Sequence, residues 1–227
     1  MKHISNFLEY AQYLVIGYVI GLAFNICLMF AASGMFPYRL AQGEILFYAD
    51  YPIPDYYAIL AQRMSETVSR SPLYRSGMPF RVHLCKGKCR YLFFTLLNKQ
   101  AIGYYDRANE NIFIDVRSMF QSRELLKTMV HEATHAIVHN NLGFIEALFL
   151  QQWVSEGYAE YIAHATPLSK HDLKEVEVSH IRETAPTSYR RYHLLVANAL
   201  DVKRIPLETL LHSPPTKRDL EKELGAI

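Results

Sequence analysis

The residues best suited to chemistry in this sequence are two histidines four positions apart, His131 and His135, with Glu132 directly after the first. They lie within residues 122–139, whose apolar spacing predicts a helix. Because side chains four positions apart share one helical face, about 6 Å apart along the axis, both imidazoles can bind one tetrahedral zinc ion. Glu132 then lies beside the metal, where a carboxylate can take a proton from zinc-bound water. The pattern therefore predicts a hydrolytic zinc site.

A zinc site of this kind needs a third protein ligand, and two patterns could supply it. A later histidine would require glycine at position 138 and histidine at position 141, but the chain has Val138 and Asn141. An acidic ligand on a following helix fits better, because Glu156 comes 21 residues after His135, which leaves room for an antiparallel return. Glu160 lies one turn beyond Glu156 on the same helical face, where it can accept a hydrogen bond from a zinc-bound histidine.

Each of these residues also has a purely structural interpretation. The two histidines can be ordinary residues of a helix, and Glu156 or Glu160 taken singly can be a solvent-exposed helix charge. Their occurrence together, after the histidine motif and inside an otherwise apolar helix, favours the site. Glu146 is a weaker alternative for the third ligand, and His139, one turn beyond His135, is expected to be structural.

The two motifs resemble a known zinc signature. HEATH at 131–135, followed by WVSEGYAEYIA at 153–163, looks like the signature of the gluzincin metallopeptidases, the thermolysin-like group. It is particularly similar to small bacterial peptidase-MA-like domains whose second motif reads W-x-x-E-G-x-A-E-Y. The strong resemblance covers residues 122–163. It implies zinc ligands at His131, His135 and Glu156, Glu132 as general base, and Glu160 hydrogen-bonded to a ligand.

The resemblance also implies how a substrate is held. In this family an edge strand before the active-site helix binds the substrate backbone by strand addition, and residues 111–116 (NIFIDV) would be that edge. A tyrosine or histidine usually stabilises the oxyanion, and three residues compete for this role: Tyr189, Tyr192 and His193. For each of them a purely structural role is an equal alternative.

Together these residues predict an enzyme, a zinc metallopeptidase that hydrolyses peptide bonds in a peptide or protein substrate, with Glu132 as general base and later general acid. Two alternatives stay open. One is a non-catalytic, membrane-anchored binding protein that keeps the zinc-peptidase fold, although a pure binder has no need of Glu132. The other is a membrane protein without metal in which the histidine pattern is accidental.

The amino-terminal part of the chain has the pattern of a membrane anchor. Residues 14–32 are nineteen positions with only Asn25 strongly polar, and a helix of about 20 residues spans a bilayer core. We expect a short tail over residues 1–12 and an uncleaved transmembrane signal-anchor helix over 13–36. A cleaved signal peptide, with small residues at 31–33, is the alternative.

The location of the domain is predicted from this anchor and from two cysteines. Cys85 and Cys89 enclose three residues, so a short turn can bring their sulfur atoms into bridging range, which favours an oxidising compartment. Two free thiols are equally compatible with the spacing. We expect a single-pass membrane protein with an extracytoplasmic catalytic domain.

The rest of the chain must form the elements that position the site. Residues 37–55 contain three prolines and are predicted to be an extended connector, followed by one metallopeptidase-like domain over 56–227. Within that domain the patterns predict one helix, three strands and then helices from residue 122 onward, with the first four elements at 56–68, 80–85, 91–97 and 111–116. Strands followed by helices indicate an α+β fold: a small mixed sheet, an active-site helix and a mainly helical C-terminal half.

Composition excludes other classes. The 227 residues carry 24 Lys plus Arg against 22 Asp plus Glu, a net charge of +2, so no basic excess supports nucleic-acid binding. Half of the chain is hydrophobic, which excludes a disordered protein, and three cysteines are too few for a disulfide-built scaffold. Oligomeric state is not indicated.

Overall fold

The computed structural model describes residues 16–17, 19–21, 23, 32–95, 102–118, 122–164 and 187–224. The predicted tail at 1–12 and most of the predicted anchor at 13–36 lie outside these residues. Within the described ranges, no helix combines the length and apolar character that a membrane crossing requires.

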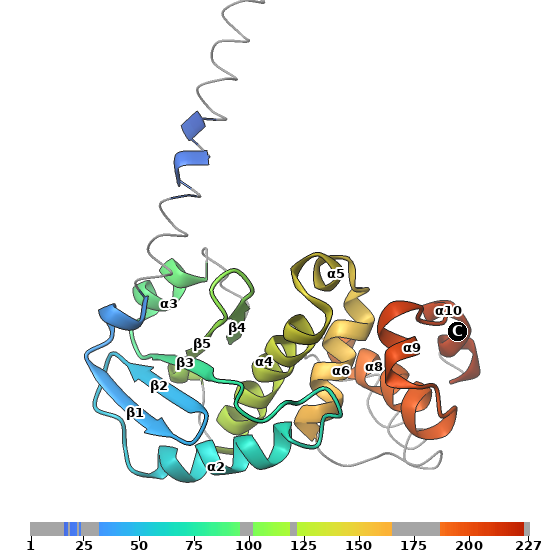
Figure 1. Ribbon diagram of the computed structural model, residues 1–227, viewed down its shortest axis with the longest axis horizontal. Helices are drawn as coiled ribbons and strands as arrows, with labels where there is room; N and C mark the ends of the chain where they lie inside the picture. The colour runs from blue at the N-terminus through green and yellow to red at the C-terminus, as the bar shows by residue number, and fades with distance from the viewer. Residues whose placement is uncertain are drawn as a thin grey trace, which may run out of the picture.

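A five-stranded mixed sheet occupies one side of the molecule (Figure 1). Its strands run in the order β1-β2-β3-β5-β4. Their bounds are β1 Tyr38–Gln42, β2 Ile45–Ala49, β3 Phe80–Cys85, β4 Gly103–Asp106 and β5 Asn111–Asp115. The central strands β2, β3 and β5 are parallel, whereas β1 and β4 pair antiparallel at the two edges.

The segment at 37–55 is not the extended connector that its prolines predicted, because it contains the hairpin β1–β2. Strand β2 alternates between buried and half-buried side chains, with Ile45, Phe47 and Ala49 facing the core. The turn between the strands uses Gly43 at a φ of +58°, a conformation that glycine adopts without strain. The prolines therefore bracket the hairpin, and the folded unit begins before residue 56.

The aromatic segment at 91–97 was predicted as a strand, and this is wrong for its described part. Residues Lys88–Phe94 form helix α3, which begins after Gly87. Tyr91 and Phe94 lie three positions apart and are both buried, in a small cluster with Phe36 and Phe113 on one face of the sheet. Helical spacing of these rings, rather than alternation, is what buries them.

The strand predicted at 111–116 is present at 111–115, but it is not an edge. Strand β5 lies between β3 and β4, and all five of its residues are buried. Ile112 and Ile114 join the main core while Phe113 joins the small cluster, so both faces are covered. The edge strand nearest the histidine helix is β4, which the sequence patterns did not identify as a strand.

Helices cover the sheet and form the other half of the molecule, so the predicted α+β class is confirmed. Helix α2 (Tyr56–Val68) has the predicted bounds. The helices that follow the sheet are α4 Ser122–Leu142, α5 Phe144–Phe149, α6 Gln152–His164, α8 Thr187–Ala197, α9 Leu207–His212 and α10 Lys217–Glu223. Short helical turns occupy η1 Ala32–Met35, η2 Val116–Ser118 and η3 Asn198–Val202.

Helix α4 lies between the sheet and α6 and belongs to the main core (Figure 1). Its buried apolar residues, which include Met129, Val130, Ala133 and Ile137, pack in the cluster that also contains side chains of the sheet, α2 and α6. This packing fixes the rotation of α4 about its axis. Consequently the face that carries the two histidines is turned toward α6.

Candidate metal centre

The two histidines of α4 face each other across one helical turn. The Nε2 atoms of His131 and His135 are 3.1 Å apart, and their rings meet edge-on with centroids 4.9 Å apart. His131 is only 8% exposed, and His135 is half-buried. The i, i+4 spacing therefore brings both nitrogen atoms to one point, as expected for residues on one helical face.

Helix α6 supplies a carboxylate to the same point. Glu156 Oε2 lies 3.2 Å from His131 Nε2 and 3.4 Å from His135 Nε2. The three atoms form a triangle whose sides, 3.1, 3.2 and 3.4 Å, are close to the roughly 3.3–3.4 Å that separates ligand atoms in a tetrahedral zinc site with bonds of about 2.0–2.1 Å. Among the described residues, these three are the His, Cys, Asp or Glu side chains that lie close enough together to hold one metal ion. Their geometry fits a zinc ion.

Outer partners determine which ring nitrogens face inward. His131 Nδ1 lies 3.1 Å from Glu160 Oε1, and His135 Nδ1 lies 3.3 Å from Ser155 Oγ. The charge of an ionised carboxylate attracts a proton to the ring nitrogen that faces it, so in the neutral form of His131 Glu160 favours a proton on Nδ1 and a lone pair on Nε2. Nε2 of His131, Nε2 of His135 and Oε2 of Glu156 converge, and such a group of acceptor atoms is stable only where a proton or a metal cation lies between them.

The charges of the pocket favour a cation as well. Burial lowers the pKa of His131, but hydrogen bonds to Glu156 and Glu160 outweigh it and raise that pKa to about 10. Burial opposes ionisation of Glu160, yet His131 and Lys127 bring its pKa down to about 2. Lys127 Nζ lies 2.8 Å from Glu160 Oε2 and so fixes the outer carboxylate. The pKa values of Glu156 and Glu160 are therefore both lowered, and two ionised carboxylates lie beside the histidine pair.

Glu132 lies beside this triangle without joining it. Its side chain is buried, and burial raises its pKa, although His131 and His135 act in the opposite direction. The backbone N–H of Tyr105 in strand β4 donates a hydrogen bond to the carboxylate. Burial therefore makes this carboxyl group a stronger proton acceptor than an exposed glutamate.

Sequence reasoning missed Gly103, which lies against Glu132. A methyl group at this position of β4 would be 2.6 Å from Glu132 Oε1 and 2.7 Å from Thr128 Cγ2, so any larger residue would displace the carboxylate. A glycine inside a strand indicates close approach of another group, and that signal was present at position 103. It went unused because residues 103–106 were not identified as a strand.

The three residues considered for oxyanion stabilisation have different surroundings, although all lie on α8. The ring of Tyr189 is half-buried, with its centroid 5.9 Å from that of His131. The ring of Tyr192 instead contacts Lys217 Nζ at 4.7 Å. His193 is buried and stacks on His164 at 4.4 Å, and its Nε2 has no hydrogen-bond partner among the described residues. Tyr189 is the one whose ring adjoins a candidate ligand.

The weaker candidates lie elsewhere. Glu146, the alternative third ligand, is on α5 with a side chain 61% exposed, and its Oε2 is 3.7 Å from His212 Nδ1. His139 accepts or donates a hydrogen bond at 2.9 Å with the hydroxyl group of Tyr105, between α4 and β4. Glu146 is therefore outside the triangle of ligand atoms, and His139 joins α4 to the edge strand.

The predicted cysteine pair is described only in part. Cys85 ends β3 as a buried free thiol, and burial raises its pKa, which makes it unreactive. The side chain of Cys89 lies outside the described residues.

The motif residues of the gluzincin resemblance, in α4 and α6, are the ones that meet in this pocket. Scans of the chain against protein-family models and against curated proteins found no match.

Proposed function

We propose that this chain is a zinc-dependent metallopeptidase of the gluzincin type. One observation carries the proposal: the imidazole nitrogens of His131 and His135 and a carboxylate oxygen of Glu156 lie within 3.4 Å of one another. Zinc bound to these three ligands would act as a Lewis acid that acidifies water and polarises a substrate carbonyl group.

Glu132 is the proposed general base and acid. Its carboxyl group is buried next to the ligand triangle, and burial raises its pKa toward the range in which proton transfer in both directions is efficient. It would take a proton from the attacking water molecule and deliver it to the leaving amide nitrogen. The N–H of Tyr105 and the close contact with Gly103 hold the carboxylate in place for both transfers.

Tyr189 is the proposed donor to the developing oxyanion. Burial, followed by the nearby charges of Glu156 and Glu132, raises its pKa to about 12, so its hydroxyl group keeps its proton at neutral pH. A neutral hydroxyl group in a partly desolvated site can donate a hydrogen bond to an oxygen atom that becomes negative in the transition state. The proximity of its ring to His131 supports this role over Tyr192 and His193.

Strand β4, rather than β5, is the proposed site of substrate addition. The N–H of Asp115 bonds to the carbonyl group of Ile102 at 2.8 Å, and the antiparallel register pairs Gly103 with Ile114. Hydrogen-bonded and non-hydrogen-bonded pairs alternate along an antiparallel ladder. Because Ile102 and Asp115 form a bonded pair, Gly103 and Ile114 form a non-bonded one, and the backbone N–H and C=O of Gly103 point away from β5. A peptide substrate could bond to them as a further strand, next to Glu132.

A membrane tether remains part of the proposal. The apolar residues 14–32 support a single-pass anchor, and an extracytoplasmic domain stays the preferred orientation. The non-catalytic binding protein is the main competitor, and the following experiment separates the two.

The test compares Glu132→Gln with Glu124→Gln in the full chain, purified in detergent and loaded with zinc. Glu124 is an exposed residue of the same helix, so it controls for loss of one carboxylate from α4. We expect Glu132→Gln to keep one zinc ion per chain and to lose about 10²–10⁴-fold in the rate of peptide hydrolysis, whereas Glu124→Gln keeps both.

Two results would contradict the proposal. Unchanged hydrolysis by Glu132→Gln would remove Glu132 from the mechanism. A wild-type chain that binds one zinc ion but cleaves no member of a diverse peptide library would identify a binding protein instead.

A further inference from the structure

Helix α5, which joins α4 to α6, presents an apolar face to solvent. Its residues Phe144, Ile145, Leu148 and Phe149 are between 48% and 83% exposed, and Phe149 is the most exposed of them. The spacing i, i+1, i+4 and i+5 places all four on one side of the helix. We call these four residues the α5 apolar face.

The domain holds this face in a fixed orientation. Gly143 at a φ of +81° makes the turn that starts α5, and its carbonyl group accepts the N–H of Ala147 at 3.1 Å. Ala147 points inward and is buried, and the ring of Phe144 also contacts His139 of α4, with centroids 5.9 Å apart. The four apolar side chains are therefore displayed by a packed helix rather than by a loose end.

The chain segment that carries the α5 apolar face contains little charge. Between Asn140 and Trp153 the only charged residue is Glu146, and the exposed flanking positions include the uncharged amides Gln151 and Gln152. The carboxylate of Glu146 is 3.7 Å from His212, on the flank of the helix. An exposed apolar helix face can be buried at the boundary between lipid headgroups and acyl chains.

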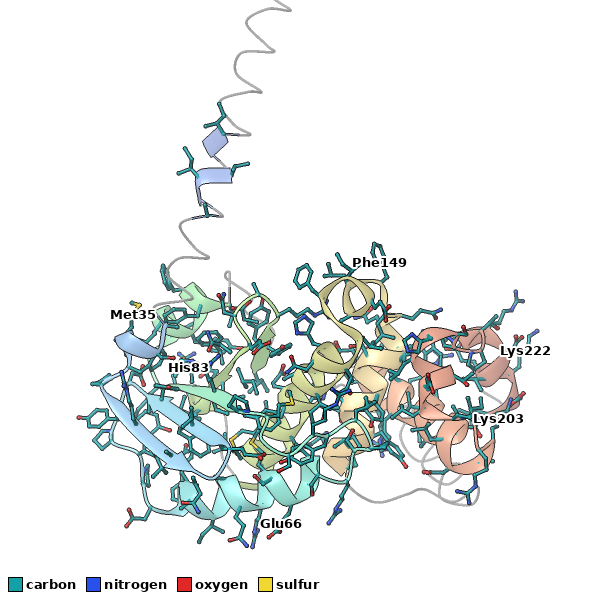
Figure 2. The ribbon with its side chains drawn as sticks, in the orientation of Figure 1. Met35, Glu66, His83, Phe149, Lys203 and Lys222 are labelled. Carbon is teal, nitrogen blue, oxygen red and sulfur yellow. The ribbon has the colours of Figure 1, made fainter. Side chains whose placement is uncertain are left out.

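Other exposed apolar residues lie on the same side of the molecule. Figure 2 shows Met35 and Phe149 at the upper edge of the domain, and Met35 is 43% exposed. Short described pieces of the amino-terminal segment, within residues 16–23, are helical, and they appear in blue beyond that same edge (Figure 1). Their exposed side chains belong to the nineteen-residue apolar stretch, which has the length of one bilayer crossing.

We propose that the α5 apolar face inserts into the surface of a lipid bilayer, the same bilayer that holds the amino-terminal segment. The domain would then touch the membrane at two points, the end of its anchor near Met35 and α5. A second copy of the chain fits less well, because the four side chains offer at most roughly 500 Å², below the about 800 Å² per partner of a stable interface. The described pieces of the apolar amino-terminal segment lie beyond the same edge, and this is what selects lipid as the occupant.

The experiment places a fluorescent reporter in the face. Phe149→Trp is introduced into the full chain, reconstituted at one copy per phosphatidylcholine/phosphatidylglycerol nanodisc, with and without brominated acyl chains. The matched control is Tyr56→Trp. Tyr56 is 45% exposed and belongs to α2, the helix at the opposite edge of the domain in Figure 1. The native Trp153 is buried and contributes the same background to both.

We expect brominated lipid to quench the added fluorescence of Phe149→Trp at least threefold more than that of Tyr56→Trp. Equal quenching would overturn the proposal. Emission that shifts to the blue only at several copies per disc, without quenching by brominated lipid, would also overturn it and would assign the face to a second copy.

A second measurement does not depend on tryptophan. Ile145→Glu combined with Phe149→Glu should raise hydrogen exchange of α5 amides in nanodiscs at least fivefold, because charged side chains leave the acyl region. Ile59→Glu on α2, where Ile59 is 57% exposed, should leave exchange of its own helix unchanged. Equal exchange of α5 in the wild type and the double variant would contradict insertion.

Discussion

Two buried histidines, His131 and His83, show how neighbours decide what an imidazole does. His131 in α4 faces the carboxylates of Glu156 and Glu160, and these raise its pKa to about 10 despite its burial. His83 in β3, labelled in Figure 2, is fully buried, and this burial lowers its pKa to about 4.

The surroundings of His83 explain the difference. Its Nε2 lies 3.2 Å from the amide oxygen of Asn111, and its ring stacks between those of Tyr48 and Phe113. All of these neighbours are uncharged, so His83 stays neutral and fills space. A buried histidine becomes a cation site only where ionised acceptors surround it, and the predictions below test this contrast.

The largest difference is expected when each histidine is removed. His131→Ala should abolish zinc binding and peptide hydrolysis, since it leaves only two ligands, whereas His83→Phe should keep one zinc ion per chain. Metal content of the purified chains by mass spectrometry, with circular dichroism as the check on folding, decides it. Loss of zinc from folded His83→Phe would contradict a purely structural role for His83.

Acid stability should depend on His83. Its folded pKa of about 4 lies below the unfolded value of 6.5, so between these values the unfolded chain binds more protons. The free energy of unfolding therefore falls as pH drops from about 6.5 to about 4, with a contribution from His83 of about 3 kcal/mol at 1.36 kcal/mol per pKa unit.

This contribution is measurable by denaturant titration across that pH range. His83→Phe should show a shallower fall in the free energy of unfolding than the wild type, because it has no imidazole to protonate. Parallel curves for the two chains would mean that His83 keeps its ordinary pKa.

Gly103→Ala should affect the proposed general base, Glu132, without affecting the proposed metal ligands. The added methyl group would push Glu132 aside, since its three nearest atoms belong to Glu132 and Thr128 and none to a candidate metal ligand. Misplacement by about 1 Å can cost about 100-fold in rate. We expect kcat to fall by about that factor with zinc content unchanged. Gly34→Ala is the control, because its methyl group would meet no atom within 4 Å; equal activity of both variants would contradict the role of Gly103.

The smallest effect is expected at the outer carboxylate. Glu160→Gln should weaken zinc affinity by about 10–100-fold, because a neutral amide replaces the negative charge that lies 3.1 Å from His131 Nδ1. Lys127→Met, which removes the other partner of Glu160, should weaken it less. Competition with a fluorescent chelator measures both, and equal affinity of Glu160→Gln and the wild type would show that Glu160 does not support the ligand.

Local patterns predicted local structure well. Helix α2, strand β3 and most of β5 lie where their apolar spacing indicated, because burial of one face imposes its period on a short segment. The same local geometry makes His131 and His135 a pair, since any helix brings residues four apart together. The prediction was wrong for the aromatic segment of α3, because its closely spaced rings fit both the two-residue period of a strand and the 3.6-residue period of a helix.

The sequence by itself determined the histidine pair, the neighbouring Glu132 and a plausible acidic partner. Only the tertiary structure decided that Glu156 rather than Glu146 meets the pair, that β4 rather than β5 is the edge strand, and that Gly103 lies against Glu132. The reason is physical: spacing along a helix is set by its own backbone, whereas the neighbour across a sheet or on the next helix is set by packing between distant segments.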